Sequence, residues 1–298
     1  NVNFPSGLEV EGGGRVVGGW GHHGLVPRSV DPLSRFSPLT REWFTGTFVQ
    51  PTPAQAQAWH AIADGDNTLV IAPTGSGKTL AAFLWAIDGL AREPATKGTR
   101  VLYVSPLKAL AIDVERNLRT PLAGIARIAA QDGAVAPDIT VGVRSGDTPP
   151  AMRRQLITHP PDILITTPES LFLMLTSAAR ETLTGVSTVI VDEVHAVAAT
   201  KRGAHLAVSL ERLDALLDRP AQRIGLSATV RPAEEVGRFL TGGRPVRIVA
   251  PPAAKTFDLA VQVPVPDMTD LAENTIWPDV ENRIVDLIDA HTSTIVFT

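Results

Sequence analysis

The chain has 298 residues, and its 27 lysine and arginine side chains against 31 aspartate and glutamate give a formal net charge of −4. This length suits one large or two modest domains, with a core large enough to need no cross-link. The absence of cysteine excludes disulfides, Cys-ligated zinc and a cysteine nucleophile, and it suits a reducing cytoplasm. A net acidic chain is not expected to coat nucleic acid by charge, although backbone amides and hydroxyls could still bind phosphates locally. No apolar run approaches the ~20 residues of a membrane span, so we expect an intracellular protein without a membrane partner.

The first 30 residues differ from the rest of the chain. They contain glycine-rich runs without periodicity, which predicts a flexible segment. The run Leu25–Ser29 follows two histidines closely, as in a vector-derived cleavage tag. A native extension is the alternative, and the sequence leaves both open.

From Leu33 onward, short apolar runs alternate with amphipathic or Ala/Leu-rich stretches. The apolar runs lie at Thr68–Ala72, Val101–Val104, Ile139–Val143, Ile163–Ile165, Val189–Val191, Arg223–Leu226 and Val246–Val249. The helical patterns include Lys78–Ala91, Pro106–Arg119, Pro150–Thr158 and Ala204–Leu217. Strands that alternate with helices predict an α/β domain over residues 31–250, with a parallel sheet covered by helices on both faces.

A proline-rich stretch over residues 251–277 is interpreted as a linker, with a β-like piece at Phe257–Val263. A helix is expected from Pro278 to about Ala290, followed by an apolar strand at Thr294–Thr298. Residues 278–298 therefore read as the beginning of a second α/β domain. Because the chain stops within a predicted strand, we expect it to be a fragment of a longer protein.

The segment Ala72–Thr79 follows a buried strand and opens a helix, which is the context of a phosphate-binding loop. Its glycines let backbone N–H groups turn toward phosphate oxygens, and the helix N-terminus adds partial positive charge. Lys78 would reach the β- and γ-phosphates of ATP, and the Thr79 hydroxyl would bind Mg²⁺. Ala72 departs from the usual pattern, which begins with glycine. The predicted nucleotide-binding residues are Thr74, Gly75, Ser76, Gly77, Lys78 and Thr79.

An acidic segment further along the chain supplies the carboxylates that nucleotide hydrolysis at this loop requires. The apolar run Val189–Val191 ends in Asp192 and Glu193, which places both carboxylates at the ligand-binding edge of a parallel sheet. Asp192 is the candidate Mg²⁺ ligand, and Glu193 is the candidate that orients and polarises the attacking water. With Lys78, these two residues form the predicted catalytic set.

The sequence from Asp192 to His195 resembles the DExH box of superfamily 2 helicases. Four further segments follow the order of that family's motifs: Pro51–Gln55 as the Q motif, Ser105–Leu110 as motif Ia, Thr166–Ser170 as motif Ib and Ser227–Thr229 as motif III. Three segments are most similar to the large helicase-related (Lhr) proteins: Thr167–Leu171, Lys201–Leu206 and Leu226–Val230. The resemblance covers about residues 33–298 and implies a RecA-like P-loop NTPase domain followed by the start of a second RecA-like domain.

The resemblance also implies roles for individual residues. Gln55 would read the adenine edge, and His195 would link the nucleotide state to motif III through Ser227 and Thr229. The implied nucleic-acid contacts are Ser105, Lys108, Arg144, Gly146 and Thr167.

Several of these residues also have ordinary structural interpretations. Ser105 and Thr167 precede prolines, as strand ends or helix N-caps often do, although a cap and a phosphate contact are compatible. The loop around Gly146 could be a simple turn. Three aromatic residues in helical patterns are expected in the core rather than as platforms for bases: Trp59, Phe83 and Trp85.

The function implied by the resemblance is an ATP-dependent helicase or translocase in DNA repair, which moves 3′→5′ on single-stranded DNA in the bacterial cytoplasm or nucleoid. RNA or an RNA–DNA hybrid remains open as the loading strand. The family's motifs V and VI, with their arginine fingers, belong to the second domain, so we expect weak activity from these 298 residues alone. The alternative is a catalytically incomplete module that binds nucleotide and nucleic acid. A transporter-type ATPase would need an LSGGQ-like segment before the acidic strand, and the sequence has none.

Overall fold

The computed structural model describes residues 31–93, 98–228, 230–252, 259–265 and 275–297. For residues 108–112 it describes only the backbone. The expectation for residues 1–30 lies outside the described residues. Contacts divide the chain into two compact units, residues 1–252 and 253–298, and each is described by itself.

A seven-stranded sheet forms the centre of the first unit, with strand order β3-β4-β2-β5-β6-β1-β7 and every neighbouring pair parallel. The strands are β1 (Thr68–Ile71), β2 (Val101–Val104), β3 (Val141–Arg144), β4 (Ile163–Thr166), β5 (Thr188–Val191), β6 (Gln222–Ser227) and β7 (Arg247–Val249). Each arises from one of the seven predicted apolar runs. The predicted α/β class with a parallel sheet is confirmed.

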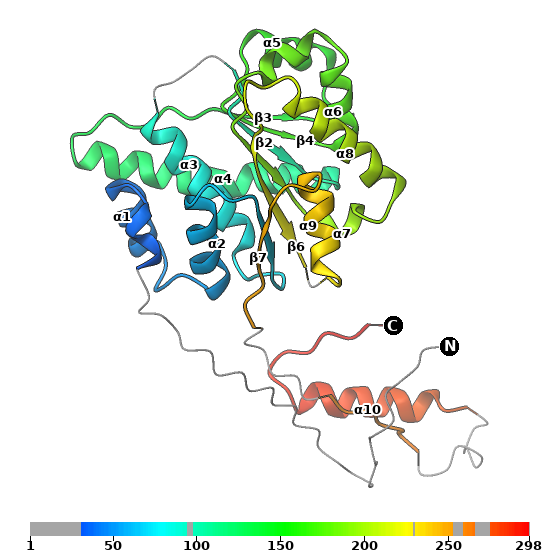
Figure 1. Ribbon diagram of the computed structural model, residues 1–298. Coiled ribbons are helices and arrows are strands. Elements are labelled where there is room, and N and C mark those ends of the chain that lie inside the picture. Colours follow the sequence, from blue (N-terminus) through cyan, green and yellow to red (C-terminus); the bar gives the residue numbers. More distant parts are fainter. Residues whose placement is uncertain (1–30, 94–97, 229, 253–258, 266–274, 298) are drawn as a thin grey trace. The chain divides into compact units, whose positions relative to one another are not determined.

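Helices cover both faces of this sheet (Figure 1). One layer contains the 3-10 turn η1 (Pro32–Arg35), α1 (Pro38–Thr47), α2 (Pro53–Ala63), α3 (Lys78–Arg92) and α4 (Lys108–Gln131). The other layer contains α6 (Pro168–Leu175), the 3-10 turn η2 (Ala178–Leu183), α7 (Val194–Val197), α8 (Lys201–Asp214) and α9 (Ala233–Thr241). Because successive strand residues face opposite sides, Val70 packs in the first layer's core whereas Leu69 and Ile71 pack in the second. Helix α5 (Pro150–Thr158) has no buried residue.

The aromatic residues expected in the core lie there. Trp59 and Phe83 are buried, and Trp85 is partly buried against the same cluster. The indole of Trp59 also donates a hydrogen bond to the Ala81 carbonyl at 2.9 Å, so it is fixed between α2 and α3.

Helix α4 is longer than the prediction, which ended it near Arg119. It continues to Gln131 with Pro121 inside it, although an interior proline costs about 3 kcal/mol. Tertiary packing offsets that cost, because Leu118 and Ile125 are buried on either side of the proline. Close contact with α1 adds to this: a Cβ on Gly124 would lie 2.1 Å from the Trp43 Nε1.

The second unit contains α10 (Trp277–Asp289), where the sequence predicted a helix from Pro278 to about Ala290. The strand predicted at Thr294–Thr298 and the β-like piece at Phe257–Val263 are not strands where residues 259–263 and 294–297 are described. An extended run becomes a strand only when another strand takes up its hydrogen bonds, and the described part of this unit offers none. In the described part of the chain, no helix combines the length and the apolar character that crossing a membrane requires.

Candidate nucleotide and nucleic-acid site

The sheet register brings the predicted nucleotide residues together at the carboxyl ends of β1, β6 and β5. Ile71, which leads into the phosphate loop, is paired with Ser227. Val191, which leads into the acidic segment, is paired with Gly225 on the same neighbouring strand. Motif III therefore lies between the phosphate loop and the DExH box, as its proposed coupling role requires.

The phosphate loop depends on two glycines with left-handed backbone, Gly75 with φ of 80° and Gly77 with φ of 78°. Lys78 follows as the first residue of α3, and its ammonium donates hydrogen bonds to the carbonyls of Ala72 at 2.7 Å and Pro73 at 3.1 Å. Burial lowers the pKa of Lys78, although the nearby carboxylates of Glu193 and Asp192 act to raise it. The basic and acidic parts of the predicted catalytic set therefore lie within electrostatic reach of one another.

Gln55 supports the phosphate loop from α2. It forms a capping box with Thr52, in which the Gln55 Oε1 accepts from the Thr52 N–H at 2.9 Å and the Thr52 hydroxyl accepts from the Gln55 N–H at 3.2 Å. The Gln55 amide also donates to the Gly77 carbonyl at 3.3 Å, and the Thr52 hydroxyl donates to the Ser76 carbonyl at 2.8 Å. The Q-motif segment thus positions the loop, while adenine recognition by Gln55 stays a prediction.

The acidic pair has two different environments. The Asp192 side chain is buried, with its Oδ1 accepting from the Glu193 N–H at 2.9 Å and its Oδ2 accepting from the Tyr103 hydroxyl. Glu193 has φ of 45°, the one positive φ outside glycine among the described residues. A left-handed non-glycine residue costs of order 1–3 kcal/mol, and such strain is concentrated at functional sites. The Glu193 side chain is 30% exposed, whereas Asp192 is 6% exposed.

His195 makes contacts between the acidic segment and motif III. Its Nδ1 lies 3.3 Å from the Ser227 Oγ, 3.3 Å from the backbone nitrogen of Ala228 and 3.3 Å from the Glu193 Oε2. This ring nitrogen is therefore sensitive to a shift of either strand end. Thr229, the other predicted coupling residue, lies outside the described residues.

The donor set suits magnesium bound together with a nucleotide. Thr79 offers a hydroxyl at the start of α3, and Asp192 offers a carboxylate at the end of β5. The described residues contain no group of three or more His, Cys, Asp or Glu side chains that could enclose a metal on their own. Mg²⁺ is usually held by one or two protein oxygens together with substrate phosphates and water, which fits this sparse set.

The predicted nucleic-acid residues occupy the neighbouring part of the same edge. Val104 and Arg144 are each paired with Thr166, so Ser105 and Thr167 follow adjacent strands. The Ser105 hydroxyl is buried and donates to the Leu107 carbonyl at 3.0 Å. Thr167 is buried as the N-cap of α6, as its structural interpretation predicted, and a phosphate contact at this helix N-terminus stays a prediction. The side chain of Lys108 lies outside the described residues.

Arg144 and Gly146 lie at the end of β3. Arg144 is only 9% exposed, and its Nη1 has no hydrogen-bond partner among the described residues. Burial lowers the pKa of this guanidinium, and the charge of Arg153 lowers it further. Arg153 was not predicted; it donates to the carbonyls of Gly146 and Thr148, both at 2.7 Å, and so shapes the exposed loop. The sequence signal that could have identified Arg153 was its position in the predicted helix that follows this loop.

A second unpredicted contact joins α6 to α8. Arg202 forms a two-pronged ion pair with Glu169, with the Nη2–Oε2 contact at 3.0 Å and a closer contact between Nε and Oε1. The hydrogen bond from Arg202 lowers the pKa of Glu169 to about 2. The pair neutralises a carboxylate in the first turn of α6, next to the predicted nucleic-acid contact Thr167.

The geometry agrees with the similarity of the chain to known proteins. Residues 52–236 match the family model described as DEAD/DEAH box helicase. This chain belongs to that family.

Two curated relatives are similar over most of this helicase domain. A protein of Mycolicibacterium smegmatis named Lhr helicase/probable uracil glycosylase is 76% identical over 276 residues, covering 92% of this chain and 18% of the relative. The Lhr helicase/uracil glycosylase of Escherichia coli is 55% identical over 285 residues, covering 88% of this chain and 18% of the relative. The chain thus spans less than a fifth of the length of these relatives.

A solved structure of the Mycobacterium smegmatis helicase Lhr bound to single-stranded DNA and AMP-PNP matches this helicase domain with a TM-score of 0.78 and 77% identity. The match covers 90% of this chain and 34% of the solved one. The RecA-like fold and the similarity to Lhr helicases that the sequence predicted are both confirmed.

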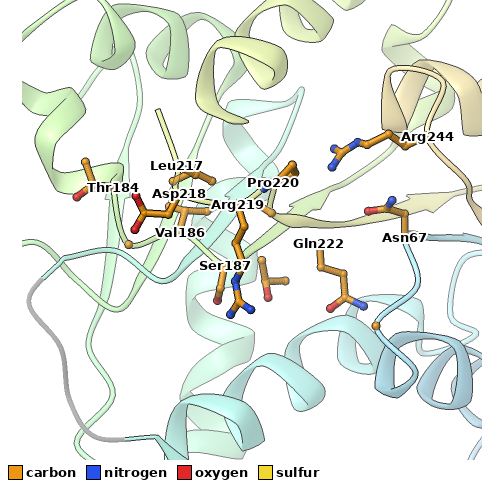
Figure 2. Close-up of a pocket in the computed structure, with 14 residues that line it drawn as sticks. Asn67, Thr184, Val186, Ser187, Leu217, Asp218, Arg219, Pro220, Gln222 and Arg244 are labelled. Carbon is orange, nitrogen blue, oxygen red and sulfur yellow. The ribbon is translucent and has the colours of Figure 1, made fainter. Parts of the chain in front are cut away.

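This helicase domain also has a cavity of about 620 Å³ at the opposite, amino edge of the sheet (Figure 2). Asn67 lies just before β1, and Gln222 is the first residue of β6. The Gln222 amide already donates to the carbonyls of Ile62 and Asp66, both at 2.9 Å. Since open α/β sheets bind ligands at the carboxyl ends of their strands, this cavity is not the nucleotide site.

Proposed function

We propose that this chain is the ATP-binding half of a helicase that couples Mg-ATP hydrolysis to 3′→5′ movement on single-stranded DNA, in DNA repair at the bacterial nucleoid. The observation that carries the proposal is that the candidate nucleotide residues and the candidate nucleic-acid residues occupy two neighbouring parts of one sheet edge. The phosphate loop, the acidic segment and motif III lie at the ends of β1, β5 and β6, while the candidate nucleic-acid residues lie at or after the ends of β2, β3 and β4. The solved Lhr relative, bound to single-stranded DNA and AMP-PNP, supports the pairing of these two ligands.

In this proposal, the N–H groups of the phosphate loop and Lys78 bind phosphate oxygens, while Thr79 and Asp192 hold Mg²⁺. Bound Mg²⁺ would neutralise charge that develops on the phosphates during hydrolysis. Glu193 orients the attacking water and takes its proton, for which its partly exposed carboxylate is suited. His195, between Glu193 and Ser227, responds to the nucleotide state.

Contacts along the neighbouring strands would hold one nucleic-acid strand by its backbone. Such contacts position the strand and read no sequence. We therefore expect sequence-independent binding to DNA, RNA or a hybrid, and the candidate contacts are Ser105, Lys108, Arg144, Gly146 and Thr167. Stepping requires a second RecA-like domain, and arginine fingers such as those of that domain are worth about 10³–10⁵ in rate, so hydrolysis by the 298 residues alone should be slow.

The test is ATP hydrolysis by this chain and by a version extended through the following domain, each with and without single-stranded DNA. We expect DNA-stimulated hydrolysis from the extended version alone, reduced at least about 100-fold by Glu193→Gln. Glu235→Gln, at an exposed position of α9, is the matched control and should have no effect. Duplexes with a 3′ or a 5′ single-stranded tail then determine the direction of movement.

If neither version hydrolyses ATP, the motor proposal fails. The chain would then be the alternative, a module that binds nucleotide and nucleic acid without turnover. Fast unwinding by the 298 residues alone would instead contradict the need for a second domain.

A further inference from the structure

Tyr103 is the only tyrosine of the chain and lies one strand away from the acidic segment. It belongs to β2, where it is paired with Ile190 of β5, and it is completely buried. Its hydroxyl donates a hydrogen bond to the Oδ2 of Asp192. None of the sequence motifs assigned a role to this residue.

The contact fixes the Asp192 carboxylate from its second side. The Oδ1 is already held by the Glu193 N–H at 2.9 Å, so each oxygen accepts one hydrogen bond and the side chain cannot rotate without losing both. Burial and the Asp192 charge raise the pKa of Tyr103, so the phenol remains a neutral donor. A carboxylate has about four acceptor positions, which leaves two or so for a metal or its water.

The Tyr103 ring is itself held by the phosphate-loop helix. Phe83 of α3 stacks on it with ring centroids 4.8 Å apart and an interplanar angle of 26°. Phe83 follows Thr79 by four residues, and residues at that spacing share one face of a helix. Phe83 and Tyr103 thus form a packed connection between the element that carries Thr79 and the carboxylate of Asp192.

We propose that Tyr103 is a positioning residue that holds the Asp192 carboxylate in the orientation required to bind the Mg²⁺ of a bound nucleotide. The proposal rests on the proposed function of this site. Partners that hydrogen-bond a metal-binding side chain typically contribute 10–100-fold to metal affinity. Since Asp192 keeps the Glu193 contact, we expect the lower end of that range for loss of the hydroxyl.

The first test measures binding of a fluorescent ATP analogue to the 298-residue chain in Mg²⁺ and in EDTA. Tyr103→Phe should weaken binding in Mg²⁺ on the order of tenfold and leave binding in EDTA unchanged. Thr241→Val, which also removes a buried hydroxyl but on α9, is the matched control and should change neither. Asp192→Asn should abolish the advantage of Mg²⁺.

The second test uses the fact that Tyr103 is the only tyrosine, so 3-fluorotyrosine labels this residue alone. The single fluorine NMR resonance should shift with Mg²⁺ and nucleotide, and remain in place with nucleotide and EDTA. Asp192→Asn should shift it without any ligand. This measurement decides the proposal even if Tyr103→Phe does not fold.

The outcomes separate the two proposals. If the unmodified chain binds nucleotide equally with and without Mg²⁺, the proposed function fails. Two results would overturn only the role of Tyr103, provided that the unmodified chain and Asp192→Asn behave as expected. In one, Tyr103→Phe binds nucleotide as much more tightly in Mg²⁺ than in EDTA as the unmodified chain does. In the other, the fluorine resonance does not shift when Mg²⁺ and nucleotide are added.

Discussion

At the scale of single residues, the candidate nucleotide site is built on backbone conformations that most side chains avoid. Gly75 and Gly77 have positive φ, and Glu193 has one without being glycine. The two glycines differ in their surroundings, because a Cβ on Gly77 would lie 2.4 Å from the Gln55 Nε2, whereas a Cβ on Gly75 would have nothing within 4 Å. Gly77 therefore meets two constraints, the curl of the loop and the close approach of Gln55.

This difference predicts unequal costs for the same substitution. Gly75→Ala should lower the free energy of unfolding by about 1–2 kcal/mol, the cost of a left-handed alanine. Gly77→Ala should lower it by about a further 1–3 kcal/mol, because the new methyl group displaces Gln55 from the Gly77 carbonyl. Urea denaturation of both variants measures the gap. If both substitutions lower the free energy of unfolding equally, Gln55 moves aside without cost and the prediction is wrong.

At the scale of elements, α6 and α8 are joined by more than the Glu169–Arg202 pair. The rings of Phe172 and His205 lie 4.5 Å apart. Gly203 allows the start of α8 to approach the preceding turn, since a Cβ there would lie 2.0 Å from the Val197 carbonyl oxygen. A displacement of the segment after the DExH box would therefore be transmitted to the helix that begins at motif Ib.

The Glu169–Arg202 pair predicts a pH-dependent part of the stability. The pKa of Glu169 is lowered from 4.5 to about 2, so the pair stabilises fully above pH 4.5 and loses its effect as pH falls toward 2. Both side chains are more than a third exposed, which limits the effect to about 0.2–1 kcal/mol. Arg202→Gln should thus be destabilising at pH 7 and less so at pH 3, measured by urea denaturation. The control is Arg180→Gln, which breaks an exposed ion pair and should lower the free energy of unfolding only slightly at pH 7. If Arg202→Gln lowers the free energy of unfolding equally at both pH values, the prediction is wrong.

At the scale of the whole domain, one buried cation connects the sheet to the helices behind it. Arg223 of β6 is 1% exposed, yet it contacts Asp214 at 2.8 Å, Glu211 at 2.9 Å and the Leu240 carbonyl at 2.9 Å. Asp214 also contacts Arg244 at 2.8 Å. The network therefore joins β6, α8 and the end of α9 below the nucleotide edge.

Removing Asp214 should leave the buried charge of Arg223 with a single carboxylate partner, Glu211, whose side chain is 56% exposed. Asp214→Ala is expected to lower the free energy of unfolding by more than about 1 kcal/mol but by less than the roughly 3–5 kcal/mol of a fully broken buried pair, because Glu211 remains. Glu235→Ala, which breaks an exposed pair with Arg238 on α9, should cost less than about 1 kcal/mol. Thermal or urea unfolding compares the two. A cost for Asp214→Ala no larger than its control would mean that water or another side chain replaces the carboxylate.

The alternating apolar runs were enough to predict seven strands and the α/β class, because strand and helix periodicities are local properties of the chain. Lys78–Ala91 was predicted within one residue of α3, since the phosphate loop itself marks the start of that helix. The helix predicted over Pro106–Arg119 stops short of Pro121, whereas α4 continues through it, because local propensity does not include the packing that outweighs an interior proline. The apolar run at Thr294–Thr298 was interpreted as a strand for the same reason, since its pattern says nothing about a pairing partner.

What the sequence determined by itself is the seven strands, the phosphate loop and the acidic segment, from which it predicts binding of phosphate, Mg²⁺ and water, because each motif is contiguous in the chain. Only the tertiary structure decided which of these residues meet. The hydroxyl of Tyr103 reaches Asp192, Arg153 shapes the loop around Gly146, and Arg202 neutralises Glu169, each across neighbouring elements. These contacts depend on strand order and register, which arise from burial of both sheet faces at once and are absent from any single stretch of sequence.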